Sequence, residues 1–195
     1  MKPLALLRGL GAAFLVSSLV SSLVLPASAQ AAPNRLGATP ACGNAAPDED
    51  SRSPESLVLA LYQIVSGPAG APKDWARMAR LFAPGALVTP TLHGSGFLAA
   101  PQRPDQFAEL NDRVFGQRAF YERELAQRTE RYGHIAHVWS SFDVRDGLDM
   151  APRARGVNSF QLMDDGKRWC ILSATWDIET PDHPLPPQFE GGSRR

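Results

Sequence analysis

The spacing of apolar positions changes along the chain from a helical to a strand-like pattern. Leu57, Leu61 and Ile64 recur every three or four residues, as on one face of an α-helix. The later runs 135–144 and 169–178 are rich in β-branched, aromatic and small residues, which is typical of strands covered on both faces. Because helices come first and strands follow, the pattern predicts an α+β domain.

Capping signals set the bounds of three predicted helices. Ser53 is a suitable N-cap for the first helix, and Gly67 ends it. Asp74 is the expected N-cap of a second, short helix that ends near Pro84. A third helix is predicted over about 105–115, where apolar residues again recur at helical spacing.

An Asp-Gly pair marks a hairpin in the last third of the chain. Asp165 and Gly166 separate the strand-like runs 156–163 and 168–178, and a tight primed turn needs the positive φ that glycine adopts readily. The last third is therefore predicted to be an antiparallel meander, with one more short strand earlier, over 86–91.

Residues 1–29 have the organisation of a secretory signal peptide. Lys2 and Arg8 precede an apolar run over 9–25, and an Ala-Ser-Ala tripeptide at 27–29 supplies a cleavage sequence. A retained membrane anchor is the alternative, but the apolar run is short for a span of about 20 residues. We therefore expect export to the periplasm or the medium.

The rest of the chain has the size of one domain. Small, polar and proline residues predict a flexible leader over 30–52 and an irregular Pro/Gly-rich tail over 181–195. The domain itself is predicted over 53–180. Without Lys2 and Arg8, the 20 basic residues of the chain fall to 18 against 20 acidic residues, so no general attraction to nucleic acid or anionic membranes is expected.

The chain has two cysteines, Cys42 and Cys170. Export permits a disulfide, but Cys42 lies in the predicted leader, and Cys170 in mid-strand is expected to pack as a small apolar group. The sequence therefore favours an unbridged pair. Neither the cysteines nor the four histidines have metal-ligand spacing, so no metal site is predicted, and no motif indicates a cofactor.

Three segments in order resemble the nuclear transport factor 2-like (NTF2-like) superfamily, which includes the ketosteroid isomerases and the SnoaL-like polyketide cyclases. They are ALYQIVSGPAGAPKDWARMARLF (60–82), FYERELAQRTERYGHIAHVWSSFDVR (120–145) and ARGVNSFQLMDDGKRWCILSATWDIE (154–179). The nearest group is formed by exported bacterial members of unassigned function.

The resemblance implies helices packed in a strongly curved antiparallel sheet, which together form a cone with an apolar pocket. It implies a strand for residues 120–131, whose pattern alone fits a helix or a strand, and a homodimer formed through the outer sheet face. Ketosteroid isomerases carry their base on the first strand, whereas residues 86–91 contain no carboxylate. A steroid isomerase mechanism is therefore disfavoured.

His137 and His93 are the candidate acid–base residues. His137 lies in the middle of an apolar strand, and His93 follows the short early strand. For each of them, a structural or exposed role is the alternative. Residues expected to line the pocket are aromatic or polar: Tyr62, Trp75, Arg155, Asn158, Trp169, Ser173 and Thr175.

Three hypotheses follow. The first is an exported domain that binds a small apolar or aromatic ligand. The second is an isomerase, cyclase or lyase that uses a pocket histidine, and the third is a dimeric interaction protein without a ligand. Whether the chain is an enzyme is left open, because a fold alone supplies no activity.

Overall fold

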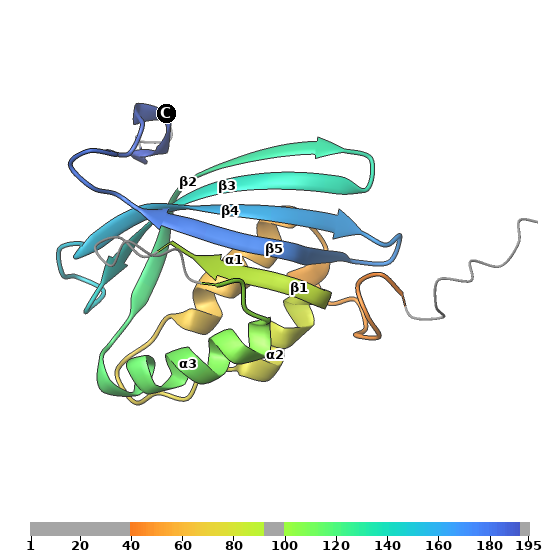
Figure 1. The fold of residues 1–195 in the computed structure, drawn as a ribbon, viewed down its shortest axis with the longest axis horizontal. Helices are drawn as coiled ribbons and strands as arrows, with labels where there is room; N and C mark the ends of the chain where they lie inside the picture. Colours follow the sequence, from red (N-terminus) through yellow and green to blue (C-terminus); the bar gives the residue numbers. More distant parts are fainter. Residues whose placement is uncertain (1–39, 92–99, 192–195) are drawn as a thin grey trace, which may run out of the picture. The chain divides into compact units, whose positions relative to one another are not determined.

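The computed structural model describes residues 40–91 and 100–191, in which three α-helices lie against one face of a curved five-stranded sheet (Figure 1). The helices are α1 (Pro54–Val65), α2 (Trp75–Leu81) and α3 (Pro104–Gln117). Ser53 and Asp74 cap α1 and α2 as predicted, each accepting a hydrogen bond from the backbone of the first turn.

The strands occur in the order β1-β5-β4-β3-β2 across the sheet. Their bounds are β1 (Phe82–Pro90), β2 (Tyr121–Tyr132), β3 (Ile135–Arg145), β4 (Ala154–Asp164) and β5 (Trp169–Ile178). The strands β2 to β5 form the predicted antiparallel meander. The sheet as a whole is mixed, because β1 pairs with β5 in parallel, which the sequence did not predict. The α+β prediction is confirmed.

The segment that fitted two patterns is the strand β2, as the resemblance implied. Its register against β3 shifts between Glu124 and Ala126. Such an irregularity re-aims side chains locally. Glu122 lines the space under the sheet, and Glu124 reaches buried Ser140 on the inner face.

The two sheet faces differ in chemistry. The inner face packs on α1 through fully buried residues that include Leu57, Val58, Val138 and Phe160. On β3, the alternate positions point outward and include His137, which is half-buried, and Trp139, which is 38% exposed. Strand alternation therefore separates an apolar interior from a mostly polar exterior.

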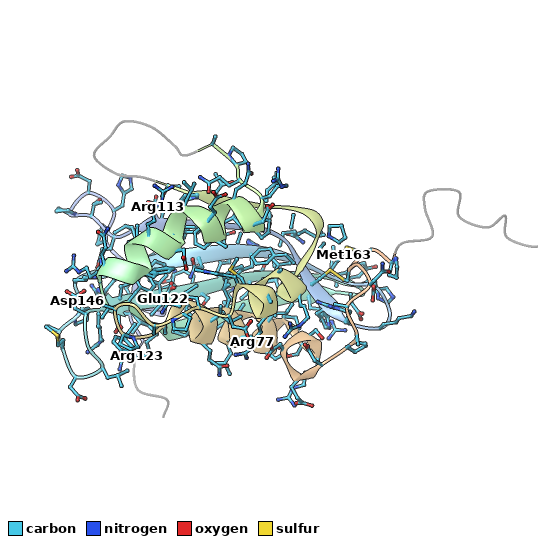
Figure 2. The ribbon with its side chains drawn as sticks, turned by 90° about the horizontal axis from the view of Figure 1, so that it is seen from below. Arg77, Arg113, Glu122, Arg123, Asp146 and Met163 are labelled. Atoms are coloured by element: carbon cyan, nitrogen blue, oxygen red, sulfur yellow. A yellow bond between two sulfur atoms is a disulfide. The ribbon has the colours of Figure 1, made fainter. Side chains whose placement is uncertain are left out.

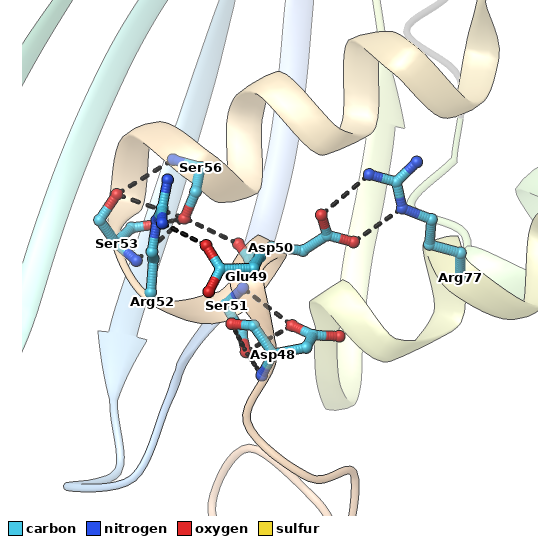
Figure 3. A network of polar contacts seen from close by, with 8 residues as sticks. All are labelled: Asp48, Glu49, Asp50, Ser51, Arg52, Ser53, Ser56 and Arg77. Atoms are coloured by element: carbon cyan, nitrogen blue, oxygen red, sulfur yellow. Dashed lines mark hydrogen bonds and ion pairs between the residues drawn. The ribbon is translucent and has the colours of Figure 1, made fainter.

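Part of the predicted leader is packed against the domain. Cys42 forms a disulfide with Cys170, whose Cα lies 5.5 Å away, so the expectation of an unbridged pair is wrong. Asp50 accepts two hydrogen bonds from Arg77 at 2.7 and 2.8 Å, in the network drawn in Figure 3. Residues 40–52 are thus anchored to α2 and β5, which short-range pattern could not reveal.

The described part of the C-terminal tail also packs on the domain. Leu185 is buried, and the carbonyl of Phe189 accepts a hydrogen bond of 2.8 Å from Ser141 on β3. The ring of Phe189 lies 6.5 Å from that of Trp139. The tail therefore covers part of the outer sheet face. None of the helices in the described ranges has the length and apolar character needed to cross a lipid bilayer.

Candidate functional site

A cavity of about 410 Å³ lies between the helices and the inner face of the sheet. Its walls are mainly apolar, with Leu61 and Val65 from α1 and Val88 from β1 among them. The aromatic side chains in the wall are Tyr62, Phe82, Phe107, Phe115, Phe120, Phe142, Phe160 and Trp176. A volume of this size suits a small organic molecule.

Three polar side chains of the cavity wall are joined by hydrogen bonds and are called its polar end here: Tyr62 from α1, Glu122 from β2 and Asn158 from β4. The other polar residues of the wall are Gln102, Asn111 and Arg153. Tyr62 and Asn158 are buried, and Glu122 is half-buried. Figure 2, which views the domain from the helix side, places Glu122 between α3 and α1. The site is assembled because β2 and β4 flank β3, and the Tyr62 hydroxyl of α1 reaches Ser140 of β3 and Asn158 of β4.

Hydrogen bonds join these groups into a chain with a defined direction. The Asn158 amide nitrogen donates to Glu122 Oε1 at 3.3 Å and to the Tyr62 hydroxyl at 3.0 Å. Ser140 donates its single hydrogen to Glu124 at 2.6 Å. Tyr62 therefore donates to Ser140, whose Oγ lies 2.7 Å from the phenol oxygen. Every side-chain donor in this chain already has an acceptor.

The electrostatics of this end favour neutral groups. Burial raises the pKa of the Glu122 carboxyl to about 7, and the hydrogen bond from Asn158 only partly opposes that shift. Burial also raises the pKa of Tyr62 well above its usual value, and the nearby Glu122 charge adds to that effect. Near neutral pH, Glu122 can therefore be charged or protonated, whereas Tyr62 stays protonated.

The mouth of the cavity lies beside α3, because two lining residues of this helix are exposed. Leu110 and Val114 line the cavity but are 52% and 55% exposed. Arg153 also lines it and lies over the Phe120 ring, 5.6 Å from the centroid. Asp146 pairs with Arg153 at 2.9 Å, so the mouth carries a paired cation.

His137 does not line this cavity. His137 lies on the outer face of β3, where its Nε2 is 3.0 Å from Ser159 Oγ and its ring is 5.0 Å from that of Trp139. The prediction of a pocket role for His137 is therefore corrected: the residue has the parity of the outward positions. His93 lies outside the described residues.

Of the seven predicted pocket residues, Tyr62 and Asn158 line the cavity, and the other five lie elsewhere. Trp75 stacks on Phe115 behind the wall and donates to Asp112 at 2.9 Å. Trp169 is buried in the core beneath the Arg131 guanidinium, 4.6 Å from its ring centroid.

The remaining three are on the outer or edge positions of the sheet. Arg155 forms a two-point ion pair with Glu179, at 2.7 and 2.8 Å. Ser173 and Thr175 are exposed on β5, and Thr175 donates to the carbonyl of Thr89 at 2.6 Å. All three have outward strand parity, and parity in the sequence does not reveal which face of a strand lies inside.

Glu122 and Glu124 are the site residues that the sequence analysis missed. Phe120, Glu122 and Glu124 occupy alternate positions, so they lie on one face once β2 is assigned as a strand. Acids on the same strand face as an aromatic residue indicate a polar group next to an apolar pocket. No group of three or more histidine, cysteine or acidic residues within residues 40–91 and 100–191 is arranged to hold a metal ion.

Comparisons with known proteins show the fold. No family model matches the chain. No curated protein matches it. A Thiobacillus denitrificans protein described as a calcium/calmodulin-dependent protein kinase type II association domain is similar over 67% of this chain and 98% of its own, with 16% identity and a TM-score of 0.52.

Two further solved structures are similar. A protein of unknown function with a cystatin-like fold from Nostoc punctiforme matches 68% of this chain and 92% of its own, at 11% identity and a TM-score of 0.51. An NTF2-like protein of unknown function from Methylobacillus flagellatus matches 64% of this chain and 89% of its own, at 16% identity and a TM-score of 0.44. Helices held against a curved sheet, together with the likeness to the Nostoc punctiforme and Thiobacillus denitrificans structures, show that the chain shares their fold, which is described as cystatin-like for the Nostoc punctiforme protein.

Proposed function

We propose that this domain binds a small, largely apolar molecule in the cavity, with the polar part of the ligand directed at Glu122. The single observation that carries the proposal is an aromatic-walled cavity of about 410 Å³ in which Tyr62, Glu122 and Asn158 form one hydrogen-bonded group. Apolar walls supply affinity by removing ligand surface from water, and a few placed polar groups fix orientation.

The proposal is tested by binding to a matched pair of variants. Leu110 and Leu59 are both helical and more than half exposed, but only Leu110 lines the cavity. We expect Leu110→Trp to narrow the mouth and weaken binding of the uncharged fluorescent probe N-phenyl-1-naphthylamine, while Leu59→Trp leaves it unchanged. Equal affinities in the two variants would place binding elsewhere. Native mass spectrometry of the purified protein would show a retained ligand directly.

A second candidate is an acid–base enzyme of the isomerase or lyase type, with Glu122 in place of a histidine. The observation in its favour is a carboxyl whose pKa is about 7 inside an apolar cavity, since general bases work best near the ambient pH. Against it, Tyr62 and Asn158 have no uncommitted N–H or O–H to stabilise an enolate. Binding is therefore the better-supported function.

The enzymatic candidate has its own test. NMR would follow exchange of the α-hydrogens of 2-tetralone for deuterium in the presence of the protein. An enzyme that uses Glu122 as base would accelerate exchange with a midpoint near pH 7, and Glu122→Gln would abolish the acceleration. No acceleration by the wild-type protein would remove this candidate for apolar ketones.

We also propose export and self-association. The disulfide supports an oxidising compartment, where such bonds persist. Ile135 and Trp139, which are 52% and 38% exposed at outward positions of β3, support pairing with a second copy on this face. Sedimentation of the wild-type protein and of Trp139→Ser tests this: a dimer that the substitution dissociates is expected, and a wild-type monomer would refute it.

A further inference from the structure

Resting on the proposed function, we propose that the ligand of this cavity is an organic amine, whose protonated nitrogen pairs with the Glu122 carboxylate while its apolar part contacts the aromatic walls. The proposal starts from the hydrogen inventory of the polar end. Asn158 donates its two amide hydrogens to Glu122 and Tyr62, and Tyr62 donates its hydroxyl hydrogen to Ser140. The site therefore offers a ligand acceptors rather than donors, as long as Glu122 is ionised.

The second step is a charge inventory. Three side chains in the cavity wall are ionisable: Tyr62 from α1, Glu122 from β2 and Arg153 from the segment before β4. Arg153 pairs with Asp146, and no ion pair to Glu122 occurs among residues 40–91 and 100–191. Glu124, two residues along β2, adds a further acid to the network. An ionised Glu122 consequently lacks a cationic partner, which a ligand cation would supply.

The walls suit such a cation. The faces of Phe, Tyr and Trp rings attract positive charge, and the attraction grows where water is excluded. The cavity wall contains six phenylalanines, Tyr62 and Trp176. A quaternary or protonated amine with an apolar body would satisfy both the rings and the carboxylate. A ligand carboxylate, by contrast, would meet Glu122 as a like charge.

The pH dependence has a definite sign. An ammonium group favours ionised Glu122, so binding lowers the pKa of this carboxyl, and affinity rises with pH through its ligand-free pKa of about 7. From pH 6 to pH 8 the ionised fraction, and with it the affinity, would rise about tenfold. A carbonyl ligand that accepts a hydrogen bond from neutral Glu122 would show the opposite trend.

The experiment compares three probes with one apolar body: 4-phenylbutylamine, 4-phenylbutan-1-ol and 4-phenylbutyrate. Titration calorimetry of the full mature protein at pH 6, 7 and 8 gives their affinities. We expect the amine to bind at least tenfold more tightly than the alcohol at pH 8, and the acid to bind most weakly. Glu122→Gln should remove the preference for the amine and leave alcohol binding in place, whereas Glu130→Gln, an exposed acid on the same strand, should change neither.

The outcomes separate the two proposals. If none of the three probes binds, and Leu110→Trp does not weaken binding of N-phenyl-1-naphthylamine, then the binding function itself fails. If N-phenyl-1-naphthylamine binds as proposed and the amine does not, only the amine assignment is overturned. If the alcohol or the acid binds as tightly as the amine, or affinity falls as pH rises, then only the amine assignment is overturned. A Glu122→Gln variant that retains its thermal transition shows that a lost preference is not a loss of fold.

Discussion

Glu122 Oε1 lies 3.3 Å from the amide nitrogen of Asn158, and this hydrogen bond holds a carboxyl under the sheet without a cationic partner among the described residues. A single neutral donor compensates only part of the cost of burying a charge. Glu122 is therefore retained at a cost to stability, as expected of a group that serves a site rather than the core.

That cost predicts a pH-dependent effect of Glu122→Gln on folding. Since the pKa of Glu122 is raised in the folded state to about 7, the folded protein binds the proton more tightly than the unfolded chain. The contribution of Glu122 to stability is present below about pH 4.5 and is lost as pH rises to about 7. We expect Glu122→Gln to stabilise the protein by about 1–3 kcal/mol at pH 8 and by much less at pH 5.

Urea unfolding at both pH values measures this difference, and Glu130→Gln is the matched control. Glu130 is exposed on the same strand and pairs with Arg128 at 2.5 Å, so its removal should shift stability by less than about 0.5 kcal/mol at either pH. If Glu122→Gln changed the free energy of unfolding equally at pH 5 and pH 8, this result would contradict the raised pKa of Glu122.

Tyr62→Phe should destabilise the domain by about 1–3 kcal/mol. The substitution removes the acceptor of one Asn158 hydrogen and the donor to Ser140, and leaves both groups buried. Thermal unfolding measures the loss. If the double variant Tyr62→Phe/Ser140→Ala is as unstable as the sum of its single variants, the two hydroxyls are not coupled as the hydrogen-bond direction requires.

Much of the fold could be predicted because it depends on local pattern. Ser53 and Asp74 marked helix starts, and Asp165-Gly166 marked the hairpin between β4 and β5. The pairing of β1 with β5 and the attachment of Cys42 to Cys170 depend on contacts between distant segments. Neither is encoded in the spacing of neighbouring residues.

The site was only partly predictable, for a related reason. Tyr62 and Asn158 were identified because polar residues are conspicuous in apolar segments. The same signal also selected His137, which lies on the outer face. A strand shows its two faces by parity but not which of them is inside. Glu122 escaped notice because its strand also fitted a helix, and charged residues are ordinarily exposed.

Gly156→Ala should be strongly destabilising even though Gly156 lies in a regular strand. A Cβ there would lie 2.3 Å from the carbonyl oxygen of Asp177 and 2.6 Å from the Phe142 ring. Phe142 lines the cavity, so the ring cannot move without changing the site. We expect a loss of about 2–4 kcal/mol in urea unfolding. Gly116→Ala is the control: a Cβ there meets nothing within 4 Å, so an effect as large as that of Gly156→Ala would contradict this reading.

The last prediction concerns the effect of the Cys42–Cys170 disulfide on stability. Cys42 and Cys170 are 128 residues apart in sequence, and a cross-link over so long a loop restricts the unfolded chain strongly. Reduction should therefore lower the free energy of unfolding by about 2–5 kcal/mol. Because the chain has only these two cysteines, the oxidised protein should contain no thiol that reacts with Ellman's reagent.

The double variant Cys42→Ala/Cys170→Ala separates the cross-link from the chemistry of the reductant. It should match the reduced protein in urea unfolding and should not respond to dithiothreitol. Its ligand binding should persist wherever it is folded, because neither cysteine lines the cavity of Tyr62, Glu122 and Asn158. A variant as stable as the oxidised wild type would show that the anchoring of residues 40–52 rests on other contacts, of which the Asp50–Arg77 ion pair is the strongest candidate.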